Sequence, residues 1–396
     1  MPRLRQEVAV SHLAGILAGA GATMLGPVLP ALCRIWPASD ADAGWWLACE
    51  FAGGCCGAAA SGWLGARLAL TKLLAAGLAL LAMGWAGAAL LQKPWLPWFL
   101  FGCGLGLGFI NPMANLIVSR AYLPSPTAAL NLFNFSWAVG ALATPSAIAW
   151  LLRHQGISPV LAELAVPAAA AAVLAAACGR GNGWKMEAET SSTGAETSVA
   201  TGWFIGITGA ILFLYVGVET SVSVWLPTGA ARWAGLSAEV SAAAQSVFWT
   251  ALLMGRLLAP VLLRHLAPRR LILAGLMCGA AGTVLVVTGF ASPVLFCGAF
   301  LAGFGLAPVN PTVVAAFTTR LGRLAARWTG PVFAAAGLGG AAIPWLVGEI
   351  SSHLGSLRAG FLAPLSALGG MLLLEIGLGS RELTGPPPAD KINRFT

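Results

Sequence analysis

Two nine-residue stretches share one pattern, and each lies inside a long apolar segment. Residues 104–112 read Gly-Leu-Gly-Leu-Gly-Phe-Ile-Asn-Pro, and residues 303–311, 199 positions later, read Gly-Phe-Gly-Leu-Ala-Pro-Val-Asn-Pro. The same interval relates two further pairs, Gly140 with Gly339 and Pro145 with Pro344. A chain whose second half repeats its first folds most simply into two similar units packed against each other.

The composition places both halves in a membrane. Apolar residues make up 58% of the chain and charged residues only 9%, against roughly 25% charged residues in a soluble domain. Such a chain cannot cover itself with a water-compatible surface, so most of it must face lipid or other helices. The 50 glycines suit helices that pack closely inside a membrane.

The apolar segments predict an all-α polytopic membrane protein with twelve transmembrane helices, at about 20 residues per span. The predicted spans are 8–32, 43–64, 73–91, 95–119, 127–151, 157–178, 202–227, 236–260, 270–291, 293–317, 328–350 and 357–379. Residues 179–200, rich in Gly, Ser and Thr, are the predicted cytoplasmic linker. They divide the chain into an N-terminal six-helix bundle, 1–178, and a C-terminal six-helix bundle with a short cytoplasmic tail, 201–396.

The distribution of positive charge predicts that both termini are cytoplasmic. With that orientation, 16 Lys and Arg lie on the cytoplasmic side and five on the other, and Arg256 alone lies inside a span. This bias is the positive-inside rule, so the net charge of +8 requires no nucleic-acid partner. Arg3 and Arg5 before an apolar stretch resemble a signal peptide. Removing that helix would break the repeat, so we expect it to be retained.

Twelve spans in two homologous halves resemble the major facilitator superfamily, which carries the loop Gly-x-Leu-Ala-Asp-Arg-x-Gly-Arg-Arg after helix two and a counterpart after helix eight. Residues 62–72 fit this pattern with gaps, and Ala66 replaces the acid. The second copy, starting at Gly255, also lacks the acid. In the superfamily these loops form charge contacts that hold the inward gate closed. Here the basic residues must find other partners. The predicted gate or structural charges are Arg67, Arg256 and Arg264.

Two stretches resemble the fucose–galactose–glucose proton symporters, a hexose-carrier branch of that superfamily. They are residues 104–115 and the segment Leu-Asn-Leu-Phe-Asn-Phe-Ser-Trp at 130–137. The resemblance implies a hexose-like cargo and symport with protons. The chain departs from that branch at its coupling acids, because Leu107 replaces a glutamate and the first predicted span contains no acid. The coupling pair of the branch therefore cannot be carried over.

Two of the acids in predicted spans, Glu219 and Glu50, are the candidates for proton coupling, because a charge inside a span costs a few kcal/mol. Glu219 and Glu50 lie about nine and about seven residues from the outer ends of their spans, roughly 10–14 Å deep at 1.5 Å per residue. A carboxyl group at this depth can bind and release a proton, so both are candidates for proton coupling, with Glu219 preferred. The alternatives are structural contacts, of Glu219 with Ser221 or Ser223 and of Glu50 with Arg256.

Amide and tryptophan side chains form the candidate substrate site. The predicted substrate-binding residues are Asn111, Asn115, Asn131, Asn134, Trp137, Gln245, Trp249 and Asn310. Amides donate and accept hydrogen bonds without adding charge, which suits a polyhydroxyl ligand, and an indole can stack on a sugar ring. Alternatives remain open. Asn111 and Asn310 precede prolines and can satisfy carbonyls freed at the kink, and the tryptophans can be packing residues.

The sequence therefore predicts a secondary transporter that rocks its bundles around a central site. The expected cargo is a small polyhydroxyl solute, a hexose-like sugar, crossing the cell inner membrane with protons as the candidate coupling ion. The expected partners are that solute, the lipid bilayer and protons, for a monomer that binds no nucleic acid. No phosphate loop, metal-spaced His or Cys, or nucleophile–base pair points to an enzyme or a cofactor. The alternatives are an efflux carrier for amphipathic molecules or drugs and a non-transporting membrane receptor.

Overall fold

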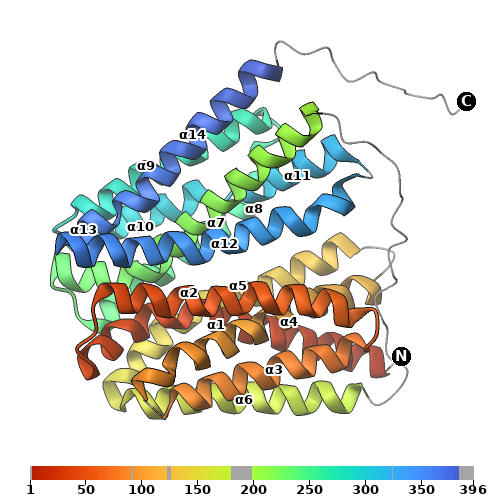
Figure 1. Cartoon of the computed structure of the whole chain (residues 1–396), viewed down its shortest axis with the longest axis vertical. Helices are drawn as coiled ribbons and strands as arrows, with labels where there is room; N and C mark the ends of the chain where they lie inside the picture. The colour runs from red at the N-terminus through yellow and green to blue at the C-terminus, as the bar shows by residue number, and fades with distance from the viewer. Residues whose placement is uncertain (1, 91, 123–125, 180–198, 323, 383–396) are drawn as a thin grey trace, which may run out of the picture.

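The computed structural model describes residues 2–90, 92–122, 126–179, 199–322 and 324–382, and its regular structure is entirely helical (Figure 1). The first half contains α1 (Pro2–Ile35), α2 (Asp40–Gly65), α3 (Leu70–Ala88), η1 (Lys93–Trp95), α4 (Leu96–Ala121), α5 (Pro126–His154) and α6 (Ile157–Cys178). The second half contains α7 (Val199–Ala234), α8 (Ala238–Leu262), α9 (Pro268–Thr288), α10 (Ser292–Leu306), α11 (Val309–Leu321), α12 (Leu324–Leu354), α13 (Leu357–Gly360) and α14 (Leu362–Glu382).

The predicted twelve-span fold is confirmed, with two spans built from two helices each. The tenth is divided into α10 and α11 at Pro308, whose ring nitrogen has no hydrogen to donate to the helix. The twelfth is divided into α13 and α14. Eleven segments of the described chain are long and apolar enough to cross a membrane. The span missing from that set is α2, where Glu50, six glycines and three tryptophans lower the mean hydropathy.

The helices form two groups that follow the order of the chain. Figure 1 shows α1–α6 on one side and α7–α14 on the other, and the groups meet mainly where α12 packs on α2 and α8 packs on α5. This division agrees with the repeat. Most of the predicted linker 179–200, namely residues 180–198, and most of the predicted tail lie outside the described residues, so the bundle boundaries stay a prediction.

The repeated glycines are points where two helices touch through their backbones. A Cβ atom on Gly104 of α4 would overlap the carbonyl oxygen of Glu50 in α2. A Cβ atom on Gly303 of α10 would likewise overlap that of Phe248 in α8. Both contacts require a residue without a side chain. The repeat in the sequence therefore encodes the same helix contact in each half.

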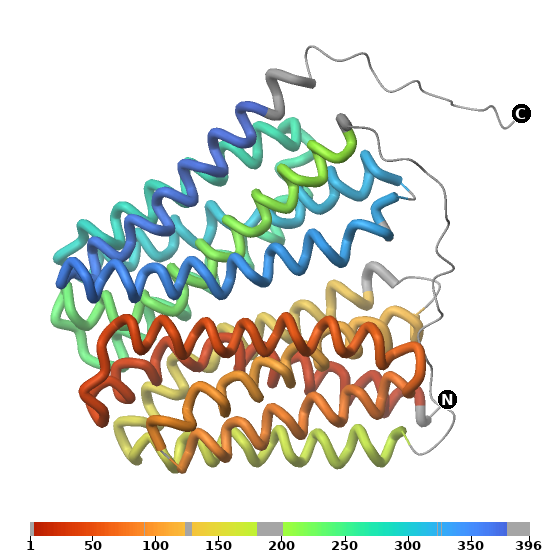
Figure 2. Tube along the Cα trace, viewed as in Figure 1, coloured from red at the N-terminus to blue at the C-terminus, as the bar shows by residue number. Residues whose placement is uncertain are grey.

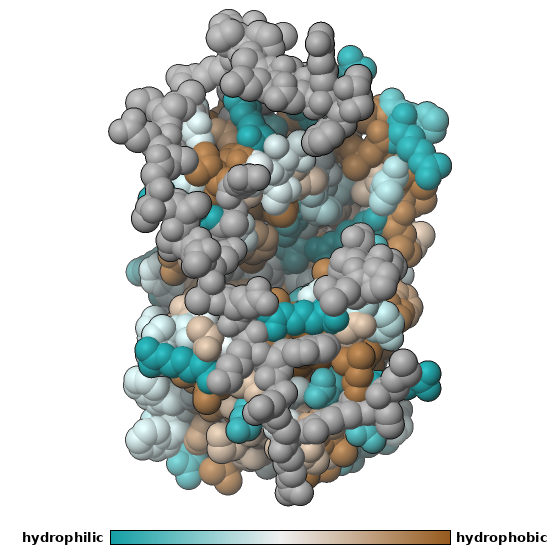
Figure 3. All heavy atoms as spheres, turned by 90° about the vertical axis from the view of Figure 1, so that its right-hand side faces the viewer, coloured by the Kyte–Doolittle hydropathy of each residue, from teal (hydrophilic) through white to brown (hydrophobic). Residues whose placement is uncertain are grey.

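The two groups of helices are close at one end of the molecule and apart at the other. We call the end where α6 stops and α7 begins the linker end. Figure 2 shows the groups diverging toward it, and Figure 3, which looks onto that end, shows a surface hollowed between them. At the opposite end, close contacts join α2 to α12, where Gly44 packs on the backbone of Trp345 and Gly348. With the linker end on the cytoplasmic side, as the charges predict, this is an inward-open arrangement.

Candidate functional site

The bundles are joined at the opposite end by a charged contact. Asp40, the first residue of α2, accepts two hydrogen bonds of 2.7 Å from Arg232 of α7 and one of 2.5 Å from Ser351 of α12. Its side chain is only 10% exposed. Burial raises the pKa of Asp40, but the hydrogen bonds from Arg232 and Ser351 and the charge of Arg232 outweigh burial, so the pKa lies below its ordinary value. Asp40 is therefore ionised at neutral pH and links the two halves.

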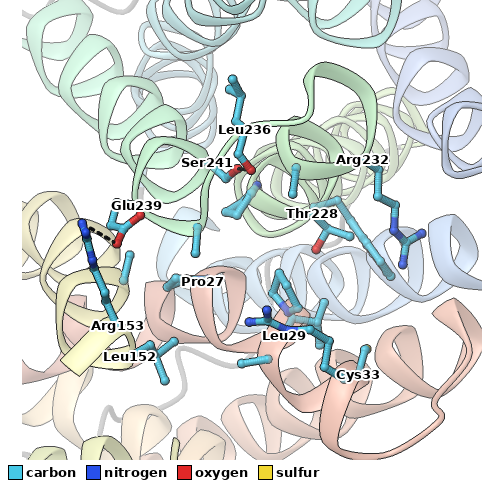
Figure 4. A pocket seen from close by; sticks show the side chains of 18 of the residues that line it. Pro27, Leu29, Cys33, Leu152, Arg153, Thr228, Arg232, Leu236, Glu239 and Ser241 are labelled. Carbon is cyan, nitrogen blue, oxygen red and sulfur yellow. Dashed lines mark hydrogen bonds and ion pairs between the residues drawn. The ribbon is translucent and has the colours of Figure 1, made fainter. Parts of the chain in front are cut away.

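A second ion pair joins the halves at this same end, between α5 and α8. Arg153 of α5 lies 3.4 Å from Glu239 of α8, and 70% of the arginine side chain is exposed. Figure 4 shows this pair and Arg232 around a cavity of about 610 Å³. The cavity lies between α1, α5, α7 and α8. Because water reaches Arg153, its ion pair is screened and holds the halves less firmly than the Asp40 contact does.

Near the midpoints of α5 and α8, two predicted site residues meet across the bundles. The rings of Trp137 and Trp249 are 5.4 Å apart in an edge-to-face arrangement. The indole N–H of Trp249 donates a hydrogen bond of 2.8 Å to Ser223 of α7. Gln245, one turn earlier in α8, is buried and donates to the carbonyl oxygen of Thr23 in α1 at 3.2 Å. We call Trp137, Trp249, Gln245 and Thr23 the roof; these residues join α1 and α5 of the first half to α8 of the second.

Glu219 lies in a polar cluster within the second half. Its carboxylate accepts a hydrogen bond from the hydroxyl of Tyr215, one turn earlier in α7. Arg256 of α8 places Nη2 at 3.3 Å from the same oxygen. Neither Ser221 nor Ser223 fills the partner role considered from the sequence. The cluster holds one negative and one positive charge, so it is neutral as it stands.

Asn131 and Asn134 are exposed residues of α5 on its approach to the linker end. Asn131 precedes Leu142 by eleven residues, about three helical turns, so both lie on one side of α5. Leu142 accepts a hydrogen bond of 2.9 Å from Ser246 of α8. The asparagine therefore lies on the side of α5 that faces α8, where the halves diverge. Asn134 lies one turn from Trp137 on the same side.

The remaining amides are on α4 and α11. Asn115 donates a hydrogen bond of 2.8 Å to the carbonyl oxygen of Asn111, within the helix. Asn111 lines a second cavity together with Glu50. Asn310 lies near the start of α11 and is half-buried. In the described part of the chain, the side chains of Asn111 and Asn310 make no hydrogen bond to a backbone carbonyl, so the kink-satisfying interpretation gains no support.

Arg67 and Arg264 lie at the linker end and are exposed. The guanidinium of Arg67 stacks over the ring of Trp63, 4.1 Å from its centre. Such a stacked arrangement is a cation–π contact. Arg256, the third predicted charge, is the partner of Glu219 described above.

Several contacts of the site were not predicted. Asp40, Arg232 and Ser351 were not among the predicted site residues, because a single sequence carries no signal that pairs residues so far apart. Tyr215 was not predicted as the partner of Glu219. Their spacing of four residues, one helical turn, was a signal that could have found it.

The chain resembles known proteins over nearly its whole length. Residues 12–344 match the model of the Major Facilitator Superfamily. An uncharacterized MFS-type transporter of Yersinia pestis is 25% identical over 399 residues, covering 97% of both chains. A putative glucose/galactose transporter of Helicobacter pylori is 27% identical over 151 residues, 38% of this chain and 37% of its own. The solved structure of a bacterial homolog of the human lysosomal transporter Spinster, inward-facing and occupied, gives a TM-score of 0.77 at 16% identity, covering 96% and 97%.

Proposed function

Because the chain belongs to the major facilitator superfamily, it is a multi-pass secondary transporter of a small molecule rather than an enzyme, and we propose that its cargo is a neutral polyhydroxyl solute of hexose size. The observation that carries this proposal is the meeting of Trp137 and Trp249 at the roof. An apolar sugar face can stack on an indole, and the solute's hydroxyls need donors and acceptors close by. One tryptophan comes from each half, so rocking of the halves would make or remove the stacking surface.

Hydrogen-bond donors and acceptors lie near this aromatic pair. Gln245 leaves its Oε1 atom without a hydrogen-bond partner among the described residues, and it can accept a hydrogen bond once the roof opens. On the α5 side, Asn131 and Asn134 add amides toward the linker end. The partial match to the putative glucose/galactose transporter of Helicobacter pylori supports the same class of cargo.

We also propose that Glu219 couples transport to protons. Its carboxylate is bound by Tyr215 and Arg256. A proton on Glu219 would remove the negative charge that neutralises Arg256. The guanidinium would then be free to donate hydrogen bonds to a solute. Proton binding and solute binding would thus be linked through one arginine, and we place the carrier in a bacterial inner membrane, where a proton gradient is available.

The test is uptake of labelled hexoses into proteoliposomes, with and without an inward proton gradient. We expect accumulation driven by the gradient, and we expect Glu219→Gln to abolish accumulation while sugar still equilibrates. Trp249→Phe should weaken uptake less than Trp249→Ala, because the phenyl ring keeps a stacking face. Equilibration that ignores the gradient in the wild type would make the protein a facilitator. No hexose movement under any condition would overturn the sugar proposal and favour export of amphipathic molecules, or a receptor without transport.

A further inference from the structure

The inference concerns Glu50, a carboxyl group that the roof and the Glu219 cluster do not use. Glu50 lies in α2, and its side chain is 5% exposed. Its Oε1 atom is buried and has no hydrogen-bond partner in the described part of the chain. An ionised carboxylate in such a place is destabilised by several kcal/mol unless a positive charge is supplied.

Glu50 lines a cavity of about 670 Å³ between α1, α2, α4 and α12, on the side of the molecule away from the α5–α8 contact. This volume suits a ligand of drug size. Its walls are mainly apolar, with Phe51, Leu107, Pro331 and Phe333 among them. Besides Glu50, the described lining contains one amide side chain, Asn111. We call this space the Glu50 pocket.

The protein itself supplies no cation to the Glu50 pocket. Its described lining contains no Lys, Arg or His, and Arg256 is paired with Glu219 instead. The titratable groups near Glu50 are the thiols of Cys55 in α2 and Cys103 in α4. Thiols are uncharged at neutral pH, and the lining residues from α1 and α12 carry no titratable group. A positive charge must therefore arrive from solution.

A neutral sugar does not fit this chemistry. A polyhydroxyl solute needs many hydrogen-bonding partners, whereas the Glu50 pocket offers one carboxyl and one amide. An organic cation with an apolar body fits both features. Its charge would neutralise Glu50, its body would bury against the apolar walls, and Phe51 and Phe333 can face a cation with their ring electrons.

We propose that the Glu50 pocket binds an amphipathic organic monocation, with Glu50 as its counter-ion. In the empty pocket Glu50 holds a proton on its carboxyl, and this proton leaves to solution as the cation enters. One positive charge thus replaces another, and the net charge of the pocket is the same before and after. The site is distinct from the roof, so the proposal does not depend on the identity of the transported solute.

The test is binding of tetraphenylphosphonium, a permanent monocation with an aromatic body, to the purified full-length protein in a neutral detergent. We expect saturable binding to the wild type and at least tenfold weaker binding to Glu50→Gln. Glu163→Gln, which removes an exposed carboxylate near the start of α6, should bind as the wild type does. In weakly buffered solution, binding to the wild type should release protons in proportion to the cation bound.

A second variant keeps the test valid if Glu50→Gln folds poorly. Ala334 lines the pocket from α12 and is exposed, so Ala334→Phe should fill the space and weaken binding with Glu50 intact. Equal affinity in the wild type and in both pocket variants, or no binding to the wild type, would overturn the proposal. Binding without proton release would overturn the proposed exchange of the Glu50 proton for the cation. The hexose assay measures transport, whereas this test measures cation binding to the Glu50 pocket. Either the sugar proposal or the cation proposal can therefore fail while the other stands.

Discussion

Asp40 and Arg232 lie 192 positions apart in the chain and form a two-pronged ion pair, with both oxygen–nitrogen distances at 2.7 Å. Each residue belongs to a different half of the molecule, and Ser351 adds a third hydrogen bond to the same carboxylate. The guanidinium presents two parallel N–H groups to two oxygens, which fixes both distance and angle between the halves. Among the described residues, the ion pairs of Asp40 with Arg232 and of Arg153 with Glu239 both join the halves at the end opposite the linker.

The first prediction is that Arg232→Gln lowers the fraction of protein in which the two halves are closed at the end opposite the linker. Hydrogen bonds to charged groups contribute about 1.5–3 kcal/mol, so the ratio of closed to open protein should fall about tenfold or more. Spin labels at Pro37→Cys and Ala291→Cys, exposed at this end in different halves, would report the distance in a background without native cysteines. We expect a longer distance to become populated.

The matched control is Arg153→Gln, which removes an ion pair between the same halves. Because 70% of the Arg153 side chain is exposed, its removal should change the ratio much less than the removal of Arg232 does. Equal effects of the two variants would show that Asp40 is no more important than an exposed ion pair.

The second prediction concerns pH. The pKa of Asp40 lies below its ordinary value of 3.8 because the hydrogen bonds from Arg232 and Ser351 outweigh burial. The stabilisation by ionised Asp40 is therefore complete above that ordinary value and is lost as pH falls through the lowered pKa. We expect Asp40→Asn to leave any pH dependence between about pH 5 and 8 unchanged and to remove only a change below about pH 4. The same spin labels measure it. A transition near pH 6 that Asp40→Asn abolishes would contradict the assignment.

The sequence predicted the fold better than the site. Composition, periodic apolar spans and the repeat are properties of the whole chain, and Gly104 and Gly303 already marked the helix contacts that give both halves one architecture. The residue types of the site were also visible, because charge and amides stand out in apolar helices. Their partners were not. Whether Arg256 meets Glu219 or Glu50 depends on how α7, α8 and α2 are rotated, which residue types alone do not fix.

The third prediction tests the ion pair of Glu219 and Arg256 by its effect on stability. Arg256→Gln leaves the carboxylate of Glu219 without its counter-ion, which should lower the free energy of unfolding by about 1–3 kcal/mol after allowing for partial exposure. The double variant Glu219→Gln, Arg256→Gln removes both charges and should be more stable than Arg256→Gln alone. Thermal unfolding of all variants in one detergent measures this.

The same cycle on Arg153 and Glu239 provides the control for that measurement. The arginine of that pair is largely exposed, so the effects of its single changes should be additive within experimental error. If the Glu219 and Arg256 changes were also additive, the two side chains would not interact in the membrane-embedded protein. The structural argument for coupling through Arg256 would then be lost.

The fourth prediction concerns the contact that positions Glu50. A Cβ atom on Gly104 would overlap the carbonyl oxygen of Glu50, whereas one on Gly102, two residues earlier in α4, would meet nothing within 4 Å. Gly104→Ala should therefore push α2 from α4 and cost about 1–3 kcal/mol. Gly102→Ala should be neutral or stabilising by up to about 1 kcal/mol, since alanine favours helix. Unfolding temperatures of the two variants give the comparison.

Displacement of α2 also moves Glu50, so Gly104→Ala should weaken tetraphenylphosphonium binding while Gly102→Ala leaves it unchanged. Equal stability and equal binding in both variants would show that α2 and α4 do not touch at Gly104.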